Sequence, residues 1–133
     1  MKNITWFLCL IISLNSFLGK SQITNFKAKF ELPAVSEETS GLLFLDGKII
    51  THNDNGDDHY LYELDSLTGI LTRRIAILNT TNVDWEDLAD DETYIYISDS
   101  GNNKGDRKDL AIYRILKSDF RNKNTISAET SSF

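Results

Sequence analysis

The sequence predicts an all-β protein, because short strand patterns fill most of the chain and similar turns recur at a fixed distance. Alternating or short apolar patterns predict strands at residues 26–32, 42–45, 48–51, 60–65, 70–78, 94–98 and 110–115. The turn runs Asp54-Asn55-Gly56 and Asp99-Ser100-Gly101 stand 45 positions apart. A period of that length with about four strands per unit is typical of propeller blades. We therefore expect a β-propeller-like fold of about two antiparallel four-stranded blades in an incomplete ring.

The turns between the expected strands each carry a local signal. Asp46-Gly47 predicts a tight hairpin turn, and Gly69 supplies the positive φ that the turn at residues 66–69 needs. In the second unit, residues 87–89 lead into a polar turn at 90–93, residues 117–120 predict a short helical turn, and Ile126 begins an outer strand. The two blade-like repeats are expected at about residues 36–80 and 82–130.

The first 21 residues are expected to be a secretory signal peptide. A short basic start is followed by an apolar stretch at residues 4–18, and small residues precede a cleavage position before Gln22. The apolar stretch is shorter than the roughly 20 residues that a membrane-spanning helix needs. We therefore expect residues 22–133 to be exported as a partial propeller domain, to the periplasm, the cell envelope or the outside, with no membrane span after cleavage. The alternative is that the segment stays uncleaved as an N-terminal anchor.

Charge and cysteine content exclude some classes of function. The whole chain carries a net charge of −6, and removal of residues 1–21 takes away two lysines and the single cysteine. The exported part therefore has no disulfide, and its acidic balance leaves no basic stripe to neutralise the phosphates of nucleic acid. The same acidic balance is compatible with binding of Ca²⁺ or another divalent cation.

An acidic corner is the first candidate for chemistry. Asp84, Glu86 and Asp87 lie within four residues, and in a strand Asp84 and Glu86 point to the same side. Clustered carboxylate oxygens suit Ca²⁺, which takes six to eight oxygen ligands. In the alternative interpretation, Glu86 and Asp87 cap strand ends while Trp85 packs between blades.

Two further segments contribute candidate residues. The loop at residues 99–106 includes Asp99 and Asn102, and it either surrounds a cation or a sugar hydroxyl or forms self-supporting turns. His52, Asp54 and Asp84 are expected near the mouth of a propeller channel, where His52 would act as a base or ligand. The alternative for His52 is a hydrogen-bonded surface residue. No nucleophile elbow and no phosphate-binding glycine loop is present in the sequence.

Several of these pieces together resemble a known family. They are Gly41-Leu42, Asn53-Asp54-Asn55-Gly56, residues 61–65, Asn82-Val83-Asp84-Trp85-Glu86-Asp87-Leu88-Ala89, Ser98-Asp99-Ser100-Gly101-Asn102-Asn103 and residues 107–115. Over residues 32–118 the chain resembles secreted bacterial β-propeller proteins, which are loosely related to phytase-like esterase and gluconolactonase propellers. The resemblance implies a metal-binding role for Glu86 and Asp99. Because such proteins have about five or six blades, it also implies that this chain is an N-terminal fragment.

Three functional hypotheses follow from the sequence. The first is an exported binding or scaffold module with a divalent-cation site drawn from Glu86, Asp87, Asp99 and Asn102, and with a small molecule, a carbohydrate or a protein as ligand. The second is a metal-assisted hydrolase of esters or phosphoesters, in which the cation polarises the substrate oxygen. The third is a truncated fragment without function. The incomplete ring also predicts contact with missing blades or self-association.

Overall fold

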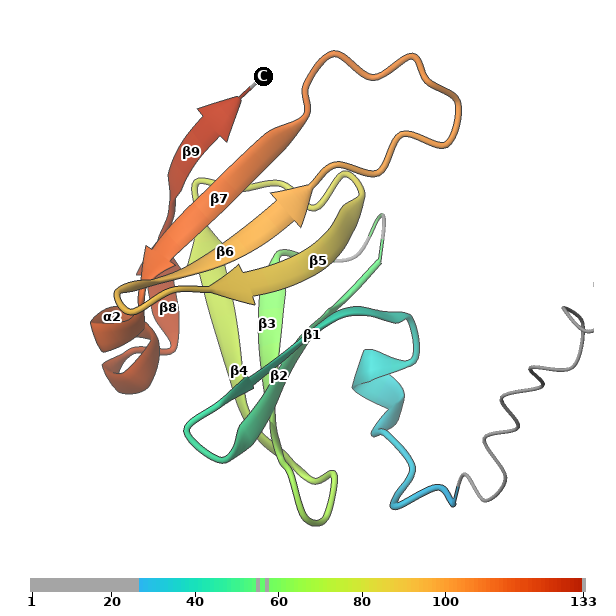
Figure 1. Ribbon diagram of the computed structural model, residues 1–133, viewed down its shortest axis with the longest axis vertical. Helices are drawn as coiled ribbons and strands as arrows, with labels where there is room; N and C mark the ends of the chain where they lie inside the picture. The colour runs from blue at the N-terminus through green and yellow to red at the C-terminus, as the bar shows by residue number, and fades with distance from the viewer. Residues whose placement is uncertain (1–26, 55, 57, 133) are drawn as a thin grey trace, which may run out of the picture.

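The chain folds into two β-sheets that face each other (Figure 1). The structure is a computed structural model that describes residues 27–54, 56 and 58–132, so the signal peptide expected at residues 1–21 lies outside the described residues. The first sheet has the strand order β1-β2-β3-β4-β8 and the second the order β5-β6-β7-β9. The all-β class predicted from the sequence is confirmed.

Hairpins build most of the first sheet, here called sheet A. Its strands are β1 (Thr39–Leu45), β2 (Lys48–Asn53), β3 (Tyr60–Asp65), β4 (Leu71–Leu78) and β8 (Thr125–Ser127). The first four strands pair antiparallel in chain order, and Asp46 and Gly47 both take positive φ in the tight turn that joins β1 to β2. The short strand β8 then pairs parallel to β4.

The second sheet, sheet B, is antiparallel throughout. It consists of β5 (Trp85–Asp90), β6 (Tyr94–Asp99), β7 (Ala111–Leu116) and β9 (Glu129–Ser132). Between β7 and β8 lies the short helix α2 (Lys117–Asn122), which confirms the helical turn expected at residues 117–120. A single 3₁₀ turn, η1 (Ala34–Ser36), precedes β1.

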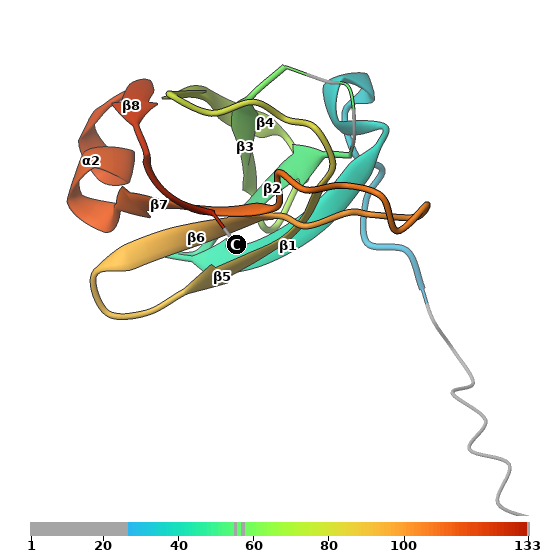
Figure 2. The same ribbon diagram turned by 90° about the horizontal axis from the view of Figure 1, so that it is seen from above.

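The hydrophobic core lies between the two sheets, with β3 and β4 on one side and β5 and β6 on the other when viewed from above (Figure 2). Alternate residues of β1, β4, β6 and β7 point into it, as the period-2 pattern of the sequence predicts. The fully buried aliphatic side chains of this core are Ile50, Leu61, Ile75 and Ile77 from sheet A and Ile95, Ile97 and Ile115 from sheet B.

The two sheets meet most closely where β1 and β2 cross β5, a contact here called the seam. Trp85 is fully buried in the seam, with its ring edge-to-face against His52 at 5.5 Å between centroids and 6.1 Å from the ring of Tyr113. At Gly41, a β-carbon would lie 2.9 Å from the backbone nitrogen of Leu88. Glycine at this position therefore lets β1 approach β5.

Helix α2 packs near the tight turn between β1 and β2, where Arg121 forms an ion pair with Asp46 at 2.7 Å. Phe120 is buried there, and the guanidinium of Arg73 lies 5.1 Å from its ring centroid. The same guanidinium donates to the carbonyl of Phe120 at 2.9 Å and to the carboxylate of Glu63 at 2.6 Å. Packing against the two sheets, and not its own six-residue length, therefore stabilises this helix.

Two features differ from the sequence-based expectations. Residues 27–32 form no strand, because Lys29 instead donates to the carbonyl of Ser66 at 2.7 Å and Phe30 packs directly over Gly69. In addition, β8 joins sheet A, so the sheets have five and four strands with one parallel pair, and not four antiparallel strands each. The described residues form no closed ring, and the arrangement as two propeller blades stays a prediction.

Replacing Asp65 with alanine is expected to lower the thermal midpoint at neutral pH, because its carboxylate organises the turn between β3 and β4. Hydrogen bonds from the Thr68 hydroxyl, the Leu67 amide and Lys48 lower its pKa from 3.8 to about 2. A carboxylate whose pKa is lower in the folded protein stabilises the fold above its unfolded pKa, and this stabilisation is lost as the pH falls through the folded pKa.

The difference in thermal midpoint between wild type and Asp65→Ala should therefore become smaller as the pH is lowered from about 4 to about 2. Thermal unfolding followed by circular dichroism measures both midpoints. Asp106→Ala, which removes an exposed carboxylate of the loop before β7, serves as the control with little effect. A difference that stays constant over this pH interval would show that the charge of Asp65 does not stabilise the turn.

Candidate functional site

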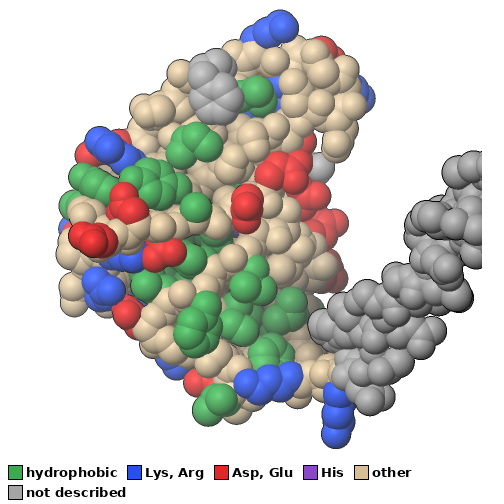
Figure 3. Space-filling model, in the orientation of Figure 1, with side chains coloured by type: hydrophobic (Ala, Val, Ile, Leu, Met, Phe, Trp, Pro, Cys, Tyr) green, Lys and Arg blue, Asp and Glu red, His purple; other side chains and the backbone are tan. Residues whose placement is uncertain are grey.

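Three carboxylates converge at the end of the seam where β2 ends and β5 begins. Asp54 directly follows β2, Asp84 directly precedes β5, and Glu86 is the second residue of β5. One oxygen from each side chain lies within 4.8 Å of the other two. Acidic side chains gather in this region on the right of the molecule, over the loops that follow β2 and precede β5 (Figure 3). The convergence brings together residues 30 positions apart in the chain, so it depends on the packing of the two sheets.

The buried side chain of Asn82 holds the two strand ends together. Its Nδ2 donates to the backbone carbonyls of Asn53 at 3.2 Å and of Asp54 at 2.9 Å. Its Oδ1 accepts the backbone N–H of Trp85 at 3.1 Å. This residue was not among the site residues expected from the sequence, although an asparagine three positions before a strand is a signal for such a side-chain bond to the backbone.

Gly101 provides the space into which two of the carboxylates point. A β-carbon at this position would lie 2.2 Å from Oδ2 of Asp84 and 2.5 Å from Oε1 of Glu86. The backbone N–H of Gly101 donates to the carbonyl of Asp84 at 3.1 Å, which keeps the chain at this distance. Any larger residue would therefore push the two carboxylates apart.

The site is electronegative and lacks a positive partner. Among the described residues, no lysine, arginine or histidine forms an ion pair with any of the three carboxylates. Partial burial, together with the charges of Asp84 and Asp54, raises the pKa of Glu86. Oδ1 of Asp54 is buried and has no hydrogen-bond partner within the described residues. A cation at this point would relieve the repulsion between the three carboxylates.

Two of the metal ligands expected from the sequence, Asp99 and Asn102, instead accept hydrogen bonds at the start of the loop that follows β6. Asp99 is buried, and its Oδ1 accepts from Arg107 at 2.8 Å and from the backbone N–H of Asp84 at 3.0 Å. Asn102 accepts the backbone N–H of Arg107 at 3.1 Å. These bonds shape the loop and hold the backbone of Asp84 in place. Asp99 therefore positions one member of the carboxylate cluster through the backbone.

Two further residues expected at the site, Asp87 and His52, are not part of the cluster of three carboxylates. Asp87 is exposed, and its Oδ1 accepts the backbone N–H of Leu88 at 2.8 Å. His52 is fully buried in the seam, where it contacts Trp85 and lies beside Gly41. Its Nδ1 is 2.8 Å from the carbonyl of Asn53, and because a carbonyl only accepts, Nδ1 carries the proton. Of the expected site residues, the structure thus brings together Asp54, Asp84 and Glu86.

Comparison with known proteins identifies no relative of this chain. No protein-family model, no curated protein and no solved structure matches the sequence or the fold. The resemblance to exported propeller proteins therefore stays an expectation. Within the described residues, no helix is both long enough and apolar enough to cross a membrane.

Asn82→Ala is expected to destabilise the protein by about 1–3 kcal/mol, because it leaves buried backbone groups at the ends of β2 and β5 without partners. Urea unfolding measures this free energy. Asn103→Ala, at an exposed asparagine of the loop after β6, is the matched control and should change the free energy of unfolding by less than about 0.5 kcal/mol. Equal effects of the two variants would show that Asn82 does not hold the strands together.

His52 is expected to make the protein less stable in mild acid. Burial in the seam lowers its pKa below 6.5, despite opposing contributions from the Asn53 carbonyl and from the charges of Asp54 and Asp87. The unfolded chain then binds the proton more readily than the folded chain. Stability therefore falls as the pH drops below the unfolded pKa, and the loss is complete below the folded pKa.

Urea unfolding in the presence of a chelator at about pH 7.5 and about pH 5.5 tests the contribution of His52. His52→Gln should show a smaller loss of stability between these pH values than wild type. His59→Gln, which replaces the histidine of the loop before β3, should keep the wild-type loss. The same loss in all three proteins would exclude His52 as its cause.

Proposed function

We propose that this protein is an exported binding module whose site includes a divalent cation held by Asp54, Asp84 and Glu86. The observation that carries the proposal is the convergence of three carboxylate oxygens, from both sheets, within 4.8 Å and without a cationic partner among the described residues. Such an arrangement is unfavourable for the isolated protein because like charges repel, and a bound cation reverses the sign of that interaction.

Calcium is the ion that the donor set favours. All three donors are carboxylate oxygens, whereas Zn²⁺ and copper are usually bound through histidine or cysteine. Three carboxylates supply three to six of the six to eight oxygen ligands that Ca²⁺ takes. The remaining positions are open to water or to oxygen atoms of a ligand, and Glu86 is exposed, so a ligand reaches the cation from solvent.

The place of the cation also gives it a structural role. Asp54 belongs to the end of sheet A, whereas Asp84 and Glu86 belong to the start of sheet B. A cation shared by them ties the sheets together at the seam, next to the bonds that Asn82 already makes. We include in the proposal the export signal and the two-blade, propeller-like arrangement, in which this end of the seam corresponds to the mouth of the channel.

Calcium is expected to raise the thermal midpoint of the protein, and a chelator to lower it again. A ligand that binds only the folded state at about 100 times its Kd adds about 2.7 kcal/mol to the free energy of unfolding. Asp84→Asn and Glu86→Gln should each abolish most of this gain, since each removes a ligand and a charge. Isothermal titration calorimetry gives the affinity and the number of sites.

The stability of the variants without the cation is a second test of the site. In a chelator, Glu86→Gln should be at least as stable as wild type, because it removes repulsion from Asp54 and Asp84. Glu92→Gln changes the same charge at an exposed position in the turn after β5 and should keep the full calcium effect. The proposed cation site would be refuted if calcium did not raise the thermal midpoint of wild type. It would also be refuted if Glu92→Gln lost as much of the calcium effect as Glu86→Gln.

A further inference from the structure

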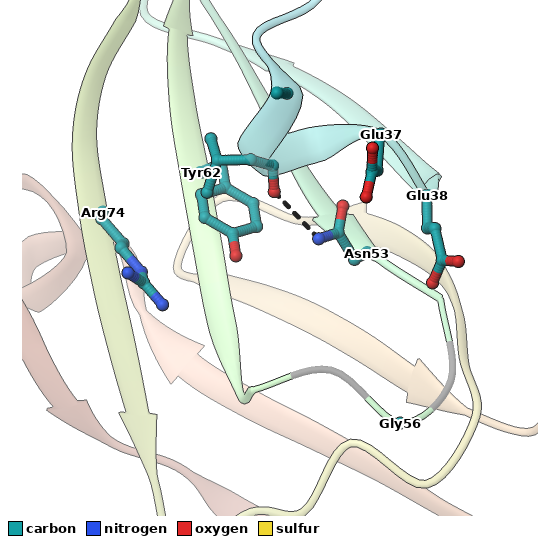
Figure 4. Close-up of a pocket in the computed structure, with 8 residues that line it drawn as sticks. Glu37, Glu38, Asn53, Gly56, Tyr62 and Arg74 are labelled. Atoms are coloured by element: carbon teal, nitrogen blue, oxygen red, sulfur yellow. Dashed lines mark hydrogen bonds between the residues drawn. The ribbon is translucent and has the colours of Figure 1, made fainter.

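A pocket lies on the face of sheet A that points away from the core. It has a volume of about 370 Å³ and lies between the segment after η1 and the strands β3 and β4 (Figure 4). Because Leu61 points into the core, the next residue of β3, Tyr62, points to the opposite face and into this pocket. The pocket is thus separate from the core and is lined by other side chains than the carboxylate cluster.

One wall of the pocket is the guanidinium of Arg74, on β4. It lies 3.8 Å from the ring centroid of Tyr60, so stacking holds it flat against the sheet. Its only recorded hydrogen bond within the described residues goes to Asp58, at 3.5 Å and through a side chain that is 69% exposed. The guanidinium is therefore preorganised, and most of its five N–H donors remain available to an anionic group.

The opposite wall is acidic. Glu37 and Glu38 follow η1, and Figure 4 shows their side chains on the other side of Tyr62 and Asn53 from Arg74. Among the described residues, neither carboxylate has an ion-pair or hydrogen-bond partner. The backbone at this wall is nevertheless fixed, because the carbonyl of Glu38 accepts the N–H of Asp54 at 2.9 Å.

Between the two walls, the floor of the pocket carries polar groups. Asn53 is anchored by its Nδ2, which donates to the carbonyl of Val35 at 2.9 Å, and Tyr62 lies beside it (Figure 4). A volume of about 370 Å³ is at the lower end of the range for small-molecule sites, roughly 300–1,000 Å³. The pocket therefore presents a positive end, a polar middle and a negative end.

We infer that this pocket binds a small zwitterion of the peptide class, with its carboxylate on Arg74 and its ammonium group on Glu37 and Glu38. A carboxylate matches the planar donor fork of a guanidinium, and an ammonium group is a compact charge that two carboxylates share. An extended tripeptide spans at most roughly 10 Å, and its backbone amides suit a polar floor. A neutral sugar would leave both charged walls without a counter-charge.

Triglycine is the probe that tests this inference, by isothermal titration calorimetry on the wild-type protein in a chelator. The chelator separates the result from the proposed cation site, because binding here needs no cation. Saturable binding below about 10 mM is expected. Acetylation of the probe's amino group, or amidation of its carboxylate, should each weaken binding by about tenfold or more.

Substitutions in each wall test whether that wall contributes to binding of the probe. Arg74→Gln should weaken triglycine binding by about tenfold, and so should Glu37→Gln combined with Glu38→Gln, at exposed positions where the fold is not at risk. Arg114→Gln is the matched control, since Arg114 is also stacked on a tyrosine and 45% exposed, but lies on sheet B. No saturable binding, equal binding of the blocked probes, or an equal loss in Arg114→Gln would each overturn the inference.

Discussion

Complete burial of Trp85 requires that β5 lie directly against β1 and β2, and this contact arranges the rest of the molecule. The indole lies between His52 of sheet A and Tyr113 of sheet B, so it removes apolar surface from water only when both sheets are in place. Gly41 permits the close approach of the backbones. With the seam fixed, the end of β2 and the start of β5 lie side by side.

This packing places groups together that repel each other. Asp54, Asp84 and Glu86 approach because their strands are held by Trp85 and Asn82, and not because the carboxylates attract. The free energy gained by burying the indole therefore offsets an electrostatic cost at the same edge of the sheets. A site where folding tolerates such a cost is where a functional ligand is expected, because strain and unfavourable charge persist when the surrounding structure holds them.

Neighbouring acidic residues have different roles because their surroundings differ. Asp99 lies next to Arg107 and accepts a backbone N–H, so its charge is compensated inside the protein. Asp84 receives its backbone support from Asp99 and Gly101, while its own carboxylate faces Glu86. Residue type and spacing alone do not distinguish the two, since both are aspartates at the ends of strands. The position of a single arginine makes the difference.

The sequence by itself determined the all-β class, the strands of the two sheets other than β5 and β9, and the acidic corner at Asp84 and Glu86, because these follow from local alternation and turn chemistry. The missing strand at residues 27–32, the pairing of β8 with β4, and the joining of Asp54 to the acidic corner were decided only by the tertiary structure. Alternation states which side of a strand is apolar, but not which partner covers it. Contacts between residues far apart in the chain depend on how two sheets pack, and no local pattern encodes that.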